Sequence, residues 1–493
     1  MLKKKFNLLS ILFLLLLGFL YRIYGLNNNY SFWTDENHVA IFVRAILERG
    51  NPILNNGYST GVYQLLQYWL SAVSSIFFGL NEFTVRSPSI IFGILTIWGV
   101  YLLGKELFNR NVGLLSAFLI SFLKIEILWS RQARPYQALQ FFFVLGAWFV
   151  YKLTKEEKFN WRYFPGFLAC GILASLMHGL GLVVFFIGFL YLLLFRFSWL
   201  KKWILLTILM ALIFGYFFKD LIFSVFSNFG DVNNLFYYRV FLLHNYPLLV
   251  LLSFIGFLFL FLQKRNSWQI PVLFLGVHGA IVSFFLDQPF TRYFYPVFPF
   301  LILLSAFSLL EIPQYFSSFF KRSKYLVFII QYMTFFALIF LFINFGHKFT
   351  FFPKQTFSLN EDMQEVPEVN WKKVYGFVDE KLKKDSDAIL ISNWNDLPVW
   401  YLGEGELDYL LRKNDSISKD ALSGSKFIPN LVELKKIINK DKKGLIVIDS
   451  WDDRVPDGIR GYIERNLKKE LEVDRLYSVQ PRYWLVEVYS WGF

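Results

Sequence analysis

Charged side chains that stand beside apolar segments are the candidates for chemistry in this chain. Asp35 and Glu36 are adjacent, and a histidine follows two positions later. Such a group can bind a metal ion, supply a general base, or cap a helix. Thr34 or Asp35 would be a good N-cap for a helix over residues 38–49, so the chemical and the capping interpretations both stay open.

Several arginines lie at the ends of apolar segments, on the side that is predicted below to be extracytoplasmic. The positive-inside rule explains basic residues on the cytoplasmic side and does not explain these. They are Arg131, Arg134, Arg239 and Arg292. Burying an arginine at bilayer depth costs about 2.5–3.5 kcal/mol on insertion scales, so such residues usually have a function. The planar guanidinium group suits phosphate. Each arginine alone is equally well explained by contact with lipid headgroups, but together they indicate an anionic ligand.

Other familiar catalytic patterns are absent from the sequence. His178 and His244 are isolated histidines, and no HExxH, GxGxxG or P-loop motif occurs. Zinc proteases and dinucleotide enzymes therefore have no support. Cys170 is the single cysteine, which excludes a disulfide within the chain and a cysteine metal cluster.

Composition predicts a membrane domain followed by a soluble domain. The 493 residues are 55% hydrophobic and only 18% charged, which disfavours a disordered chain. Residues 1–345 hold 27 of the 50 basic and 12 of the 37 acidic residues, whereas 346–493 are much more densely charged. The net charge of +13 is not a nucleic-acid signal, because the basic residues are spread between apolar runs.

A spanning helix needs about 20 mostly apolar residues. About eleven segments qualify: 6–26, 86–108, 112–129, 137–153, 163–178, 180–197, 203–218, 247–263, 270–286, 294–311 and 325–345. With Lys3–Lys5 in the cytoplasm, the inner loops contain 17 of the 27 basic residues, as the positive-inside rule requires. The sequence therefore predicts a cytoplasmic N-terminus and an extracytoplasmic C-terminal domain.

The first outer loop, residues 27–85, is predicted not to cross the membrane. Its uncharged segment 61–79 contains Gln, Ser and Tyr, and we expect it to lie along the membrane surface. The alternative, an extra tilted span, would reverse every later loop. The tail from about residue 350 predicts an α/β domain, with helices over 370–384 and 431–438 and strands at 388–391, 444–448 and 483–489.

Six local patterns resemble the C-type-fold integral-membrane glycosyltransferases, in the branch of the dolichyl-phosphate-mannose protein mannosyltransferases and the aminoarabinose transferases. In chain order the patterns are Asp35-Glu36, Glu82–Pro88, Leu103–Leu115, Ser130–Tyr136, Met177–Gly179 and Thr291–Tyr293. The chain departs from the family pattern over Tyr58–Tyr63, at Glu126 and at Gln132. These departures concern specificity more than reaction class.

The resemblance implies transfer of a sugar from a polyprenyl-phosphate donor to an acceptor hydroxyl of a protein, lipid or glycan, with inversion. We expect Asp35 as base and Glu36 as sugar-binding or orienting partner, with the reverse assignment left open, and Arg131, Arg134 and Arg292 as phosphate ligands. His178, Tyr136, Tyr293 and Arg239 are candidates for lining the site, no cofactor is certain, and a divalent metal is possible. A transporter or flippase of lipid-linked sugars and a non-catalytic binder remain the alternatives. The tail is expected to shape the acceptor site or cover the cavity.

Overall fold

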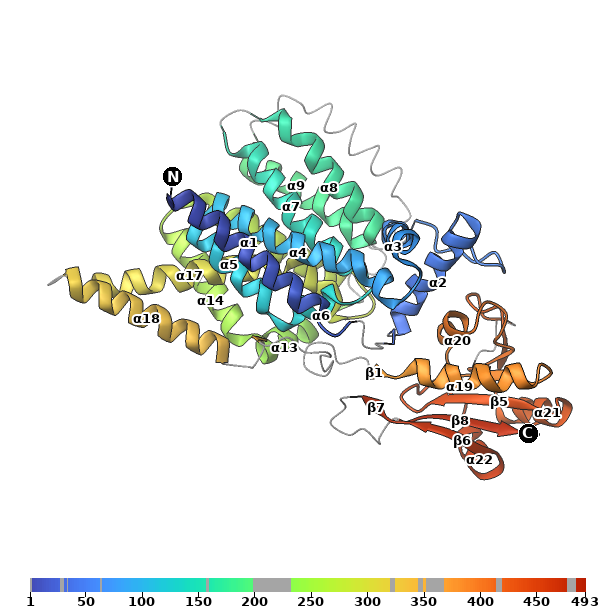
Figure 1. The fold of residues 1–493 in the computed structure, drawn as a ribbon. Coiled ribbons are helices and arrows are strands. Elements are labelled where there is room, and N and C mark those ends of the chain that lie inside the picture. Colours follow the sequence, from blue (N-terminus) through green and yellow to red (C-terminus); the bar gives the residue numbers. More distant parts are fainter. Residues whose placement is uncertain are drawn as a thin grey trace. The chain divides into compact units, whose positions relative to one another are not determined.

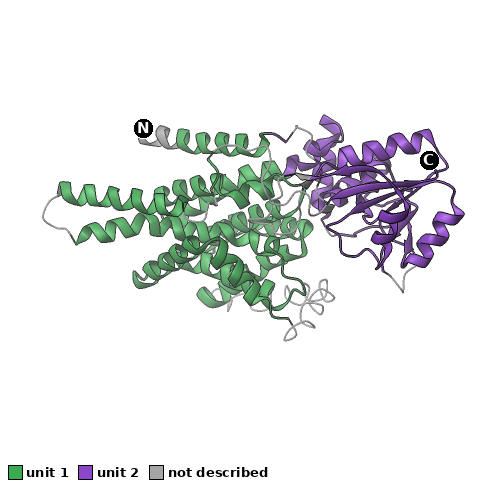
Figure 2. Cartoon of the chain, turned by 90° about the horizontal axis from the view of Figure 1, so that it is seen from below, with its two compact units in different colours: residues 1–24, 89–354 green, residues 25–88, 355–493 purple. Residues whose placement is uncertain are grey.

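The computed structural model shows a helical part and a mixed α/β part (Figure 1). It describes residues 2–26, 31–32, 34–62, 64–156, 159–197, 232–319, 324–344, 349–351, 368–413, 419–476 and 485–493. The chain forms two compact units, coloured separately in Figure 2. Unit 1 contains residues 1–24 and 89–354, and unit 2 contains residues 25–88 and 355–493.

Unit 1 is built from apolar helices. They are α1 (Leu2–Ile23), the part of α4 (Glu82–Leu107) from residue 89 onward, α5 (Arg110–Phe122), α6 (Lys124–Ser130), α7 (Tyr136–Thr154), α8 (Phe164–Met177), α9 (Val183–Phe195), α13 (Leu235–Asn245), α14 (Pro247–Leu262), α15 (Gln269–Phe284), α16 (Thr291–Phe294), α17 (Phe298–Ser318) and α18 (Lys324–Asn344). Short 3₁₀ turns are η1 (Trp161–Tyr163), η2 (Gly179–Leu182), η3 (Asn266–Trp268) and η4 (Tyr295–Val297).

Close helix packing in unit 1 centres on α17. A Cβ atom added at Gly256 of α14 would lie 2.3 Å from the carbonyl oxygen of Leu304, so only glycine permits this approach. The Ser305 hydroxyl of α17 also donates to the carbonyl of Leu249 at 2.9 Å. Small residues and hydroxyl groups are the usual means of joining helices where the surroundings are apolar.

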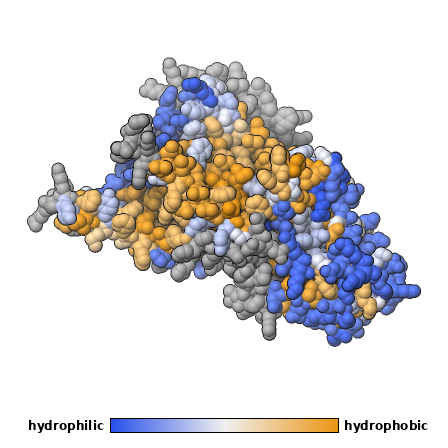
Figure 3. Space-filling view, in the orientation of Figure 1, coloured by the Kyte–Doolittle hydropathy of each residue, from blue (hydrophilic) through white to orange (hydrophobic). Residues whose placement is uncertain are grey.

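The helices confirm the predicted fold class of a polytopic membrane protein. Among the described residues, four helices are long and apolar enough to cross a membrane, and a fifth span results if α13 and α14, bent by 101°, count as one. Helices occur at the predicted segments, except that 203–218 lies outside the described residues. In Figure 3 apolar side chains gather over unit 1, and α18 exposes large ones such as Phe336 and Phe340.

The predicted helix over 112–129 is interrupted, and to that extent the prediction is wrong. Leu123 separates α5 from α6 with an extended backbone, φ −68° and ψ 126°. It forms an antiparallel bridge with Phe349, and the amide of Thr350 donates to the carbonyl of Phe122 at 2.9 Å. Backbone pairing with a distant segment therefore replaces helical hydrogen bonds at this point.

The first outer loop contributes two helices to unit 2, α2 (Thr34–Arg49) and α3 (Leu65–Phe78). α3 has 14 residues, fewer than the about 20 that a span needs. α2 begins four residues before the expected start at residue 38, so Asp35 and Glu36 lie inside its first turn. The expectation that Asp35 precedes the helix as its cap is therefore wrong, although an acidic first turn still complements the helix dipole.

The tail of the chain forms a six-stranded sheet in the order β4-β3-β2-β5-β8-β6. Its strands are β2 (Ile389–Ser392), β3 (Tyr409–Leu411), β4 (Lys426–Ile428), β5 (Gly444–Asp449), β6 (Lys468–Val473) and β8 (Val486–Trp491). β2, β3, β4 and β5 are parallel, and β8 is antiparallel to its neighbours β5 and β6. A separate antiparallel pair joins β1 (Glu368–Val369) to β7 (Arg475–Leu476).

Helices cover both faces of this sheet (Figure 1). Leu390, Leu445 and Val447 share one core cluster with α19 (Trp371–Lys384). The intervening residues of β2 and β5 pack on the opposite face against α21 (Leu431–Lys440) and α22 (Ile459–Asn466). This alternation is what a strand covered on both faces requires.

The predicted α/β elements of the tail are confirmed by α19, β2, α21, β5 and β8. The described residues also group the first outer loop with the tail, in unit 2. The predicted division into a membrane domain over 1–345 and a soluble domain over 346–493 concerns which segments lie in the membrane and which lie in water. It stays a prediction.

Candidate active site

Glu36 in the first turn of α2 forms an ion pair with Arg86. The sequence analysis named this arginine only as part of the pattern Glu82–Pro88. Arg86 donates from Nε to Glu36 Oε1 and from Nη2 to Oε2, both at 2.7 Å, and both side chains are buried. Arg86 also donates to the carbonyl of Ser31 at 3.0 Å. Such a two-bond pair fixes a carboxylate firmly. It orients the turn that carries Asp35, while the sugar-binding role of Glu36 stays a prediction.

The tail brings a second carboxyl group into the electrostatic range of Asp35 within unit 2. Helix α20 (Asp396–Tyr401) contacts α2, because Arg44 donates to the carbonyls of Val399 and Trp400 at 3.1 and 2.5 Å. Burial raises the pKa of Asp396 to about 7, and the charge of Asp35 adds to that shift. In the sequence, Asp396 follows the predicted strand at 388–391 and is not one of the candidate site residues.

A cluster of two arginines, two tyrosines and a histidine lies in unit 1. The ring of His178 is 5.5 Å from that of Tyr136 and 5.7 Å from that of Tyr293. The Arg134 guanidinium lies 5.4 Å from the Tyr136 ring, and that of Arg292 lies 5.7 Å from the Tyr293 ring. Both guanidinium groups interact electrostatically with His178. The structure thus brings together five of the predicted residues, from α7, α16 and the segments that flank α7 and α8.

This arginine–tyrosine cluster, as we call these five residues, is rich in hydrogen-bond donors. The two guanidinium groups carry five N–H donors each, and the phenols add hydroxyl groups. Arg134, Tyr136 and His178 are almost fully buried, whereas Arg292 is partly exposed. Two positive charges in such surroundings favour an anion with several oxygen atoms, such as a phosphate.

Arg131 and Arg239 have other surroundings. Arg131 is buried and donates from Nη1 to the carbonyls of Tyr21 and Tyr24, at 3.2 and 2.7 Å. It therefore satisfies carbonyl groups at the C-terminal end of α1, where a positive charge is favourable. Arg239 is exposed on α13, and its guanidinium lies 5.9 Å from the Phe236 ring. The predicted roles of both arginines in phosphate binding or site lining stay predictions.

A buried polar network in unit 1 was missed by the sequence analysis, which noted Glu126 only as a departure from the family pattern. Glu126 accepts from the Tyr295 hydroxyl at 2.7 Å and from Gln140 at 3.0 Å. The Tyr295 hydroxyl also contacts Gln137 Oε1 at 2.6 Å, and Arg22 interacts electrostatically with Glu126. The network joins α6, η4 and α7, and α7 also carries Tyr136 of the arginine–tyrosine cluster. Isolated polar residues in apolar runs were its signal.

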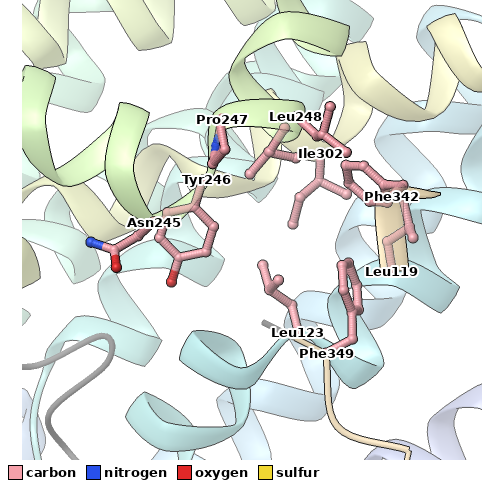
Figure 4. Close-up of a pocket in the computed structure, with 10 residues that line it drawn as sticks. Leu119, Leu123, Asn245, Tyr246, Pro247, Leu248, Ile302, Phe342 and Phe349 are labelled. Carbon is pink, nitrogen blue, oxygen red and sulfur yellow. The ribbon is translucent and has the colours of Figure 1, made fainter. Parts of the chain in front are cut away.

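An apolar pocket of unit 1 lies near the bend between α13 and α14 (Figure 4). Its wall is formed by Leu119, Leu123, Asn245, Tyr246, Pro247, Leu248, Leu249, Ile302, Phe342 and Phe349. Hydrocarbon is the chemistry that such a wall suits. Within the described parts of the chain, no group of three or more His, Cys, Asp or Glu side chains is arranged to hold a metal ion.

Residues 64–217 match the family model of the dolichyl-phosphate-mannose-protein mannosyltransferases. A putative mannosyltransferase of Bacillus subtilis, YkcB, is 22% identical over 167 residues, which are 32% of this chain and 22% of that protein. The matched region is thus less than a quarter of this relative's length. The match nevertheless confirms the predicted resemblance to these glycosyltransferases.

Solved structures confirm the C-type fold. ArnT from Cupriavidus metallidurans in the apo state superposes with a TM-score of 0.60 at 12% identity, covering 99% of this chain and 98% of that one. The oligosaccharyltransferase AglB from Archaeoglobus fulgidus, in complex with an inhibitory peptide and a dolichol-phosphate, also gives 0.60, at 14% identity and coverage of 91% and 70%. ArnT bound to undecaprenyl phosphate gives 0.56 at 11% identity, covering 99% and 98%.

Proposed function

We propose that this integral membrane protein is a glycosyltransferase that moves a sugar from a polyprenyl-phosphate donor to an acceptor hydroxyl group. The observation that carries the proposal is the arginine–tyrosine cluster, in a fold shared with proteins that were solved with undecaprenyl phosphate or dolichol-phosphate.

The first role in this mechanism is to stabilise the leaving phosphate. Negative charge grows on the phosphate oxygen as the bond to the sugar breaks, so donors placed there stabilise the transition state. Arg134 and Arg292 supply these donors, and the hydroxyl groups of Tyr136 and Tyr293 add to them. The phosphate needs no general acid, because it leaves as a stable anion.

The second role is to activate the acceptor. A hydroxyl group becomes a stronger nucleophile as its proton passes to a base, and Asp35 is the base in this proposal. Glu36, held by Arg86, orients the turn that carries Asp35. Attack opposite to the phosphate inverts the anomeric centre, and a product with retained configuration would contradict this scheme. The acceptor face is extracytoplasmic in this proposal.

Transfer of radiolabel tests the proposal. Membranes with the full-length protein receive labelled polyprenyl-phosphate sugars, and the label in endogenous acceptors is compared between wild type and Asp35→Asn at equal folded amount. Loss of a general base should lower transfer by about 10²–10⁴-fold. The matched control is Asp457→Asn, whose carboxylate is 93% exposed in the same unit and should transfer normally.

Two outcomes of this experiment would contradict different parts of the proposal. Equal transfer by wild type and Asp35→Asn would remove Asp35 from the mechanism. Absence of transfer from every polyprenyl-phosphate sugar, combined with movement of those lipids across liposomes that contain the protein, would replace the transferase by a flippase.

A further inference from the structure

The sheet of the tail contains a point at which the chain reverses its direction of winding. From β2 the chain passes to β3 and β4 on one side, and it then returns to β5 on the other side of β2. β2 and β5 are parallel neighbours, so their carboxyl ends lie at the same edge while their following segments lead to opposite sides. In open α/β sheets, ligands bind at this kind of switch point.

Two tryptophans lie at this edge. The side-chain amide of Asn393, after β2, donates to the carbonyl of Asp449 at 2.9 Å and accepts from its amide at 3.0 Å. The next residue, Trp394, is stacked with Trp451 at 6.1 Å between ring centroids and 12° between planes. Trp394 also donates from Nε1 to Asp449 Oδ2 at 3.0 Å. The ring of Trp394 is thus fixed by this hydrogen bond, and the partly exposed Trp451 stacks on it.

Arg454, Arg412 and a second carboxylate, Asp452, lie beside the tryptophans. Arg454 donates from Nε to Asp452 Oδ1 at 2.6 Å, and its guanidinium lies 4.9 Å from the Trp394 ring. Arg412, after β3, donates to the carbonyl of Asn393 at 3.3 Å. Arg412 Nη2 is 3.9 Å from the buried Asp452 Oδ2, which is too far for a hydrogen bond.

This arrangement leaves hydrogen-bonding capacity at the edge. Among the described residues, Asp452 Oδ2 and Arg412 Nε are buried and have no hydrogen-bond partner. Buried polar atoms normally have one, so an unmatched acceptor and an unmatched donor at the same edge need an explanation. A hydroxyl group, which both donates and accepts, can satisfy either atom.

We infer that the carboxyl edge between β2 and β5 binds carbohydrate, with Trp451 as the stacking surface and Arg412 and Asp452 as partners of the sugar hydroxyl groups. The acceptor would then carry a glycan, so this inference rests on the proposed transferase and specifies its acceptor. A phosphate ligand fits less well, because Asp449 and Asp452 place negative charges among the arginines.

Binding of neutral trisaccharides tests the inference independently of transfer. Saturation-transfer difference NMR is recorded with the full-length protein in detergent micelles and with maltotriose, mannotriose or chitotriose. At least one should give a signal that Trp451→Ala and Arg412→Gln each weaken at least fivefold. The matched control Trp161→Ala, in an exposed turn of unit 1, should leave the signal unchanged.

The outcomes separate this inference from the proposed function. Asp35→Asn should abolish transfer and keep the trisaccharide signal, which would support both. The inference is overturned if no trisaccharide gives a signal, if Trp451→Ala binds like wild type, or if a serine-containing hexapeptide gives the signal in place of the sugars. Arg454→Gln, whose parent side chain is 46% exposed, provides a further variant if Trp451→Ala does not fold.

Discussion

Asp396 shows how burial changes the chemistry of one residue. Its carboxyl group is buried at the start of α20, and its pKa rises to about 7 through burial and through the charge of Asp35. A carboxyl group with this pKa changes its charge near neutral pH. The charge on Asp396, which interacts electrostatically with Asp35, is therefore set by pH in the range around neutrality.

This raised pKa predicts how stability depends on pH. The folded state retains the Asp396 proton up to about pH 7, whereas the unfolded chain loses it near pH 3.8, so stability should fall as pH rises between these values. A tenfold difference in proton affinity between the two states corresponds to about 1.4 kcal/mol. Asp396→Asn should flatten the decline in apparent Tm between pH 5 and pH 8. A decline as steep as that of wild type would contradict the assignment.

Arg134 allows a test of phosphate binding by geometry. Arg134→Lys keeps the charge but loses the planar fork, so transfer should fall about 10–100-fold, the equivalent of one charge-assisted hydrogen bond of about 1.5–3 kcal/mol. The loss should appear in kcat/KM for the donor and include a lower kcat, because the charge on the phosphate grows in the transition state. Arg162→Lys, at an exposed position of η1, is the matched control. An unchanged kcat/KM for the donor in Arg134→Lys would remove this arginine from the phosphate site.

At the scale of elements, buried ion pairs and polar networks fix how helices meet. Arg86 joins the beginning of α4 to the first turn of α2, and both belong to unit 2. In unit 1 the Tyr295 hydroxyl joins η4 to α6 and α7 through Glu126 and Gln137. Groups of this kind add little net stability over an apolar core, but removal of one partner is costly.

Glu36→Gln should therefore destabilise unit 2. The change leaves the Arg86 guanidinium buried opposite a neutral amide, and breaking a buried pair in this way costs about 3–5 kcal/mol. Limited proteolysis of the detergent-solubilised protein should cleave unit 2 faster than in wild type. Glu48→Gln, at an exposed position of the same helix, should behave like wild type. If both variants resist the protease equally, the pair has no structural importance.

At the scale of the whole molecule, the first outer loop and the tail form one compact unit although some 270 residues separate them. Arg44 and Phe32 of the loop contact α20 of the tail, with 5.3 Å between the rings of Phe32 and Trp400. The tail is therefore part of the surroundings of Asp35 and not an independent appendage.

Deletion of residues 355–493 should separate donor binding from sugar transfer. Donor binding should persist, because the arginine–tyrosine cluster lies in unit 1, while transfer should fall at least tenfold, because α2 loses its contacts with α20. The cut spares Thr350, which pairs with the carbonyl of Phe122. Binding of labelled polyprenyl phosphate and transfer are measured on the same folded sample. Normal transfer by the truncated protein would contradict a role for the tail at the acceptor.

The sequence determined those features that depend on local composition and periodicity. Apolar runs of sufficient length must be helices in a membrane, and short β-branched runs that end in Asp or Asn must be buried strands with a polar edge. Six ordered motifs were enough to indicate the family. The same local patterns singled out Asp35, Glu36, Arg134, His178 and Arg292.

Only the tertiary structure decided which of these residues meet. The pairing of Glu36 with Arg86, the grouping of Arg134 with Tyr293, and the break at Leu123 all depend on segments far apart in the chain. Asp396 belongs to an ordinary loop in the sequence and acquires its raised pKa from burial against distant elements. Burial and charge act through space, so local sequence does not contain them.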